Sequence, residues 1–256
     1  MQSGFSIGEY FSVIVLHEFI GTGLLVLLGC GVVALQHLRR SWGFGSDWLL
    51  TSIGWGFAVF VGASVAWHSG AQLNPAVTLG LALIGKTGWA AVPFYWLGQI
   101  AGAFVGAGVV YLAYKKQFDV EPEPDTTGGI FYTAPAVRSL GWNTVTEVIG
   151  TFVLVYWILQ QSPWVPPEGS NPPNYGNVAL GYAGVAFCVL AVGAGLGGPT
   201  GYAINPARDF GPRAMYSVLP IKGKQKVDWS YAWVPILGPL LGAALAAGLY
   251  AVASPF

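Results

Sequence analysis

Two stretches of the chain run for almost forty residues without an Asp, Glu, Lys or Arg, and both contain the tripeptide Asn-Pro-Ala. They extend over residues 48–85 and 169–207. A single helix of that length would be about 57 Å long, roughly twice the hydrocarbon thickness of a bilayer. Asparagine followed by proline is typical of a helix start. We therefore expect each stretch to hold one full span and then a half-helix, at residues 74–85 and 205–216.

The composition places the chain in a membrane. Hydrophobic residues make up 54% of the sequence and charged residues only 9%, whereas a soluble domain carries about 25% charged residues. We expect a multi-pass integral protein of the cell membrane, in contact with lipid. The formal net charge is zero and no basic tract is present, which argues against a nucleic-acid partner.

The charge-free windows form an internal repeat. A short, a very long and a medium window follow one another twice, and HEFIGTGLLVLLG (17–29) resembles TEVIGTFVLVYWI (146–158). Three spans and a half-helix are expected in each repeat, and three is odd, so the second repeat enters from the opposite face. The predicted fold class is an all-α membrane protein with six transmembrane helices, two re-entrant half-helices and an inverted internal repeat. It forms a single domain, with repeats at 1–116 and 143–256 and a connecting loop at 117–142.

Three polar segments rich in proline and glycine separate the apolar windows. They cover residues 117–141, 162–177 and 217–228. Segments of this composition are usually solvated surface loops. We expect that conformation for all three.

Two half-helices that enter from opposite faces would bring their positive N-terminal ends together near the bilayer centre. As caps, Asn74 and Asn205 would use the amide oxygen on their own helix and leave their NH₂ donors free for a lumen. Such a site favours oxygen lone pairs and opposes cations. Non-helical backbone at this depth is tolerated only where it is buried or lines a water-filled cavity. The sequence therefore predicts a pore or a binding site.

The two motif regions, SGAQLNPAVTLG (69–80) and GYAINPARDFGPR (201–213), resemble the aquaporin family. YWLGQIAGAFVGA (95–107) and WVPILGPLLGAAL (233–245) extend the resemblance over almost the whole chain. The resemblance implies a passive pore in each protomer of a homotetramer. It assigns the pore motifs to Asn74, Pro75, Ala76, Asn205, Pro206 and Ala207.

The resemblance also indicates a branch of the family. Arg208 occupies the place of the family's filter arginine, and an arginine at membrane depth is costly unless it faces water or a partner. Asp209 and the segment FYTAP (131–135) resemble the glycerol-conducting branch rather than the water-only branch. By the same resemblance the other filter positions fall at Trp55, Gly193 and Tyr202.

These filter residues predict a wide constriction that suits a polyol. The carbon-bound hydrogens of glycerol could lie against Trp55 and Tyr202, while Arg208 and backbone carbonyls bind the hydroxyls. Gly193 would leave room where a histidine would narrow the pore. The alternative is that Trp55 and Tyr202 belong to an interfacial aromatic belt.

Two carboxylates lie within apolar segments at matching places in the repeats. Intramembrane carboxylates are functional candidates by default. The repeated positions of Glu18 and Glu147 instead favour a supporting role, in which each accepts hydrogen bonds from the re-entrant backbone of its own half.

The sequence thus predicts a passive channel for glycerol and other small uncharged solutes, urea among the candidates, that also passes water and excludes ions and protons. The alternatives are a water-selective pore, a coupled secondary transporter and a protein with a structural role. The preferred solute among glycerol, urea, ammonia, peroxide and larger polyols stays open. We find no nucleophile–base pair, metal-ligand cluster or phosphate-binding loop in the sequence, so no enzymatic activity, cofactor or metal is expected.

Overall fold

A computed structural model describes residues 6–161 and 177–253, and over these residues the chain is helical and contains no strand. The first long helix is α2 (Leu16–His37), which continues α1 (Ile7–Glu9) and the π-helical turn η1 (Tyr10–Val15). The other long helices are α3 (Trp48–Val65), α5 (Val92–Ala113), α7 (Leu140–Leu159), α8 (Asn177–Leu196) and α10 (Val234–Ala253). Between them lie η2 (Trp67–Ser69), α4 (Pro75–Leu83), η3 (Trp89–Ala91), α6 (Lys115–Asp119), η4 (Pro124–Ile130) and α9 (Pro206–Val218).

The chain is a multi-pass membrane protein with six spans and two half-helices. Five helical segments are long and apolar enough to cross a bilayer: Ile7–His37, Trp48–Val65, Trp89–Ala113, Leu140–Leu159 and Val234–Ala253. The sixth span is α8, which is apolar over Gly181–Leu196 within the described part of the chain. Because α4 and α9 contain only 9 and 13 residues, neither can cross a bilayer alone.

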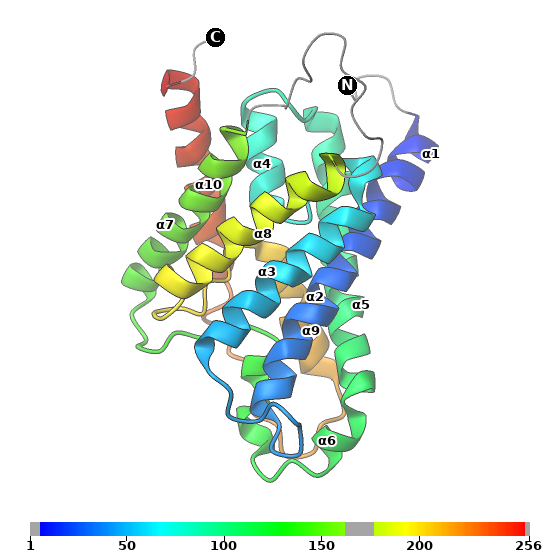
Figure 1. The fold of residues 1–256 in the computed structure, drawn as a ribbon, viewed down its shortest axis with the longest axis vertical. Helices are drawn as coiled ribbons and strands as arrows, with labels where there is room; N and C mark the ends of the chain where they lie inside the picture. Colours follow the sequence, from blue (N-terminus) through cyan, green and yellow to red (C-terminus); the bar gives the residue numbers. More distant parts are fainter. Residues whose placement is uncertain (1–5, 162–176, 254–256) are drawn as a thin grey trace.

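The two halves of the chain interlock through their half-helices. Helix α2 packs on α5, and α7 packs on α10 in the same way. The half-helices cross over, because α9 packs on α5 of the first half and α4 packs on α10 of the second. Helices α3 and α8 pack along each other, and Figure 1 shows them side by side across the front of the molecule.

Glycines allow the closest of these contacts. A Cβ atom built at Gly102 of α5 would lie 2.2 Å from the carbonyl oxygen of Phe19, and one at Gly242 of α10 would lie 2.5 Å from that of Val148. Any larger side chain would force the paired helices apart. Small residues at the contact surface are the usual basis of close helix packing in membranes.

The half-helices begin in the interior and run towards opposite ends of the molecule. Figure 1 shows α1 and the last turn of α10 at one end, with α4 in the same half, and α6 at the other end. Helix α9 lies behind α2 and α3, nearer the end that carries α6. The N-termini of α4 and α9 therefore meet between the spans.

The long connector differs from the solvated loop that its composition predicts. It contains α6 and η4, and Ile130, Phe131, Tyr132 and Thr133 are all buried. The prediction is wrong for this part because the segment folds inward and supplies backbone carbonyls to buried arginines, as described below. The segment at 217–228 also departs from it, since Leu219 and Ile221 are buried. Residues 162–176 of the second predicted loop, at 162–177, lie outside the described residues.

Candidate functional site

The N-termini of α4 and α9 are joined by their two cap asparagines. The Oδ1 atom of Asn74 accepts a hydrogen bond from the Ala76 N–H at 2.9 Å, and that of Asn205 accepts from the Ala207 N–H at 3.0 Å. Each Nδ2 reaches across to the other half. Asn74 donates to the Ile204 carbonyl at 2.8 Å, and Asn205 donates to the Leu73 carbonyl at 2.8 Å. One amide hydrogen of each asparagine is thus used in this contact, which differs from the prediction that both face a lumen.

The backbone before each cap has an unusual conformation. Ala71 and Leu73 both have φ values of 52°, and Tyr202 and Ile204 have values of 38° and 42°. Left-handed conformations of non-glycine residues cost on the order of 1–2 kcal/mol each and persist only where their surroundings impose them. The same strained pattern occurs before both half-helices.

Two buried glutamates hold these strained segments. Glu18 accepts from the N–H groups of Gln72 and Leu73, at 2.9 and 2.6 Å. Glu147 accepts from those of Ala203 and Ile204, at 3.0 and 2.8 Å. Hydroxyl donors complete each set, because Ser69 bonds Glu18 and Thr200 bonds Glu147. Gln99 also donates to Glu18 at 2.9 Å. These carboxylates therefore bind and position the backbone before each half-helix.

A cavity of about 160 Å³ runs along the junction of the half-helices. Most of its lining is apolar, and the polar side chains are few. The lining includes Gly70, Ala71, Gln72, Leu73, Asn74, Ala203, Ile204, Asn205, Val59, Ala63, Val77, Leu154, Val185 and Val189.

Three of the four predicted filter residues line this cavity together. Trp55, Tyr202 and Arg208 are exposed by only 3%, 6% and 8% and belong to α3, the loop before α9, and α9. The Arg208 guanidinium carbon lies over the Trp55 ring, 3.9 Å from its centroid. Its Nη1 donates to the Phe131 carbonyl at 3.3 Å. The alternative of an interfacial aromatic belt does not fit side chains buried to this degree.

Gly193, the fourth predicted filter residue, does not leave room for the solute as predicted. It is not among the residues that line the cavity, and a Cβ atom at this position would lie 2.7 Å from the Tyr202 ring. The room that the missing side chain leaves is filled by Tyr202. Gly193 thus shapes the constriction by letting Tyr202 pack against α8.

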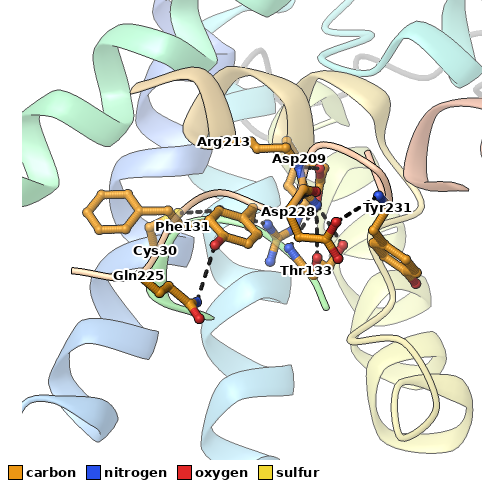
Figure 2. A network of polar contacts seen from close by, with 10 residues as sticks. Cys30, Phe131, Thr133, Asp209, Arg213, Gln225, Asp228 and Tyr231 are labelled. Atoms are coloured by element: carbon orange, nitrogen blue, oxygen red, sulfur yellow. Dashed lines mark hydrogen bonds and ion pairs between the residues drawn. The ribbon is translucent and has the colours of Figure 1, made fainter. Parts of the chain in front are cut away.

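Asp209 does not face the cavity but anchors the connector. Its carboxylate pairs with Arg213 through Nε at 2.7 Å, and both side chains are fully buried. Thr133 donates to the same carboxylate from its N–H at 2.8 Å and its hydroxyl at 2.6 Å. Figure 2 shows this cluster, in which Arg213 also donates to the carbonyls of Thr133 and Asp228, both at 2.9 Å. The network fixes the chain two residues from Phe131, the partner of Arg208.

Several residues of the site were missed by the sequence analysis. Arg213 pairs with Asp209 at a four-residue spacing, which is a recognisable helical ion-pair signal. The Phe131 carbonyl accepts from both Arg208 and the Cys30 thiol, as Figure 2 shows for Cys30. No sequence signal marks a backbone carbonyl in a distant loop. Gly29 was missed as well, although a Cβ there would lie 2.2 Å from the Trp55 ring.

The arrangement is suited to bind and pass small neutral molecules with oxygen atoms. Two helix N-termini and one guanidinium point positive charge at the same narrow space, which disfavours cations. The apolar walls favour carbon-bound hydrogens. In the described part of the chain, no group of three or more His, Cys, Asp or Glu side chains could hold a metal ion.

Comparison with known proteins gives a consistent result. The family model described as Major intrinsic protein matches residues 9–250. A probable glycerol uptake facilitator protein of Thermotoga maritima is 49% identical over 92% of this chain and 97% of its own length. Glycerol uptake facilitator protein 3 of Lactiplantibacillus plantarum is 46% identical over 93% of this chain and 95% of its own. The X-ray structure of the aquaglyceroporin from Plasmodium falciparum superposes with a TM-score of 0.76 at 31% identity, over 94% of this chain and 95% of that one.

Proposed function

The chain belongs to the major intrinsic protein family, and on that premise we propose that it is a passive membrane channel for glycerol and similar small uncharged solutes. The channel also passes water. The observation that carries the proposal is the common placement of Trp55, Tyr202 and Arg208 on one cavity that continues past both cap asparagines. Two relatives described as glycerol facilitators support glycerol as the solute.

The geometry suits a molecule with one apolar and one polar side. Trp55 and Tyr202 offer ring surfaces to the carbon-bound hydrogens of an extended polyol. Arg208 offers guanidinium N–H donors to its hydroxyls, since only Nη1 is engaged by Phe131 among the described contacts. A solute without a hydrogen-bond acceptor would leave these donors unpaired in a desolvated site, at a cost of about 1–3 kcal/mol each.

Cations are opposed by the same features. The N-terminal ends of α4 and α9 carry partial positive charges, and Arg208 adds a full one at the constriction. Protons are excluded because the second amide hydrogen of Asn74 and of Asn205, which the contact between the two halves leaves free, orients passing water oxygens towards the asparagines. By resemblance to the family, four copies of the chain form a homotetramer with one pore in each.

Stopped-flow swelling of proteoliposomes tests the proposal. Glycerol entry well above that of protein-free vesicles, unchanged by an imposed proton gradient, is the expected result. Water flux without glycerol entry would favour a water-selective pore, and uptake that follows the proton gradient would favour a coupled transporter. No flux of either solute would favour a structural role.

A pair of variants on α8 shows whether the flux uses the described cavity. Val185 lines the cavity, so Val185→Trp fills part of it and is expected to abolish most of the glycerol flux. Phe187 on the same helix is 66% exposed and is not among the cavity-lining residues, so Phe187→Trp is the matched control and is expected to leave the flux unchanged. Equal flux in the two variants would contradict passage through this cavity.

A further inference from the structure

The two aromatic walls of the constriction are supported in different ways. Trp55 lies directly against the backbone of α2, because a Cβ at Gly29 would be 2.2 Å from its ring. Tyr202 belongs to a loop and has a left-handed backbone with φ of 38°. The position of the Tyr202 ring therefore depends on what packs around it.

The ring of Tyr202 lies on the last turn of α8. A Cβ atom at Gly193 would be 2.7 Å from one ring carbon, and a Cβ at Gly197 would be 2.7 Å from another. The glycine surface supports one side of the ring. A second contact with the ring comes from α3.

Trp48 makes this contact with the Tyr202 ring. It is the first residue of α3, two helical turns before Trp55, and its ring meets Tyr202 edge to face with centroids 5.7 Å apart. Its Nε1 donates to the Gly193 carbonyl at 2.8 Å. That carbonyl also accepts from the Gly197 N–H at 3.2 Å. Trp48 thus contacts both the ring and the surface on which the ring lies.

We infer that Trp48 is a positioning residue of the filter, which sets the width of the constriction by holding Tyr202 against Gly193. The inference rests on the proposed glycerol channel and assigns one determinant of its size limit. Trp48 does not line the cavity and need not touch the solute. Its effect passes through Tyr202.

The first test compares a four-carbon with a three-carbon polyol. Trp48→Ala removes both contacts, so the Tyr202 ring can retreat into the vacated space and the constriction widens. The ratio of erythritol to glycerol permeability is expected to rise about tenfold, which is the scale on which a fitted pocket rejects one extra carbon. Trp48→Phe keeps a ring edge but loses the N–H donor. Its permeability ratio should therefore lie between those of the wild type and Trp48→Ala.

Trp42→Ala is the matched control for these variants. Trp42 is fully exposed and lies in the loop before α3. It makes no ring contact with Tyr202 and is expected to leave the permeability ratio unchanged. A rise of the same size in Trp42→Ala and Trp48→Ala would overturn the inference.

A double-mutant cycle separates positioning from simple support of the fold. Gly193→Ala puts a Cβ 2.7 Å from the Tyr202 ring and should push it into the constriction, which lowers glycerol permeability. In a Trp48→Ala background the ring can move aside, so the loss should be smaller by threefold or more, about the least coupling that contacting side chains show. If Trp48→Ala does not fold, Trp48→Phe replaces it in both measurements.

The outcomes separate this inference from the proposed channel. The same loss from Gly193→Ala in both backgrounds, together with an unchanged polyol ratio, would overturn the role of Trp48 while glycerol still passes. Wild-type vesicles that admit no polyol would instead overturn the channel itself.

Discussion

Helices α4 and α9 start in the same way and then diverge within one turn. Both begin after a cap asparagine, follow a left-handed backbone segment and are held by a buried glutamate. After Asn-Pro-Ala, α4 continues with Val77 and Thr78, and α9 continues with Arg208 and Asp209. Thr78 only bonds its own helix start and Gln99, whereas Asp209 binds Arg213 and the connector.

This difference separates the frame of the pore from its selectivity. The shared features satisfy backbone groups that would otherwise be unpaired at membrane depth, a requirement that applies equally to both halves. The features found only in the second half bring a charged side chain and a distant loop to one end of the cavity. We infer that α4 shapes the lumen, while α9 also determines what enters it.

The largest expected effect comes from breaking the ion pair that only α9 has. Asp209→Ala leaves the fully buried Arg213 without its counter-charge and frees Thr133, and we expect a loss of about 3–5 kcal/mol in the free energy of unfolding. Thr78→Val at the matching position of α4 removes neutral hydrogen bonds only, and should cost about 1 kcal/mol. Unfolding of the purified proteins in detergent measures both.

The double variant Asp209→Leu/Arg213→Met controls for packing. It removes both charges, so it should be less destabilised than Asp209→Ala. If Asp209→Ala lost no more stability than Thr78→Val, the claim that the second half-helix depends on this pair would be wrong.

A smaller effect on the free energy of unfolding is expected from changes to the two supporting glutamates, which differ in their hydrogen-bond donors. Glu147 has three protein donors, whereas Glu18 has a fourth in Gln99, and Pro239 stands at the position in α10 that matches Gln99. Glu147→Gln leaves one backbone N–H without an acceptor, at a cost of about 1.5–3 kcal/mol. In Glu18→Gln a turn of the Gln99 amide lets the new NH₂ group donate to the Gln99 Oε1 atom, which has no hydrogen-bond partner within the described residues.

Glu18→Gln should therefore be milder than Glu147→Gln by about one neutral hydrogen bond, or about 1 kcal/mol. The unfolding midpoints of the two variants give the comparison. Adding Gln99→Leu to Glu18→Gln should remove the advantage. The reverse order of stability would mean that Gln99 does not distinguish the two halves.

The features that follow from bilayer thickness and helix starts could be predicted from the sequence. The predicted half-helices at 74–85 and 205–216 compare with observed helices at Pro75–Leu83 and Pro206–Val218. Charge-free windows and Asn-Pro pairs are local signals, and the cost of unpaired backbone in lipid leaves few ways to fold them. The family resemblance then selected Trp55, Tyr202 and Arg208 among many aromatic and polar residues.

The contacts that complete the filter could not be predicted in this way. Phe131 acts through a carbonyl that any residue would provide, in a connector whose polar composition indicates a solvated loop. Gly193 was expected to leave space for the solute, but only the three-dimensional arrangement shows that Tyr202 fills that space. Nothing in the sequence distinguishes Trp48 from the other aromatic residues near helix ends. Only the structure shows its hydrogen bond to the Gly193 carbonyl.

The most direct test of selection at the α9 end of the pore is the ratio of glycerol to water permeability in wild-type and Gly193→His proteoliposomes. A histidine at this position must displace the Tyr202 ring towards Trp55 and Arg208, since even a Cβ would lie 2.7 Å from that ring. Glycerol permeability is expected to fall at least about tenfold, the scale of a steric mismatch of one carbon, while water permeability is largely retained. An unchanged ratio in the variant would contradict this expectation.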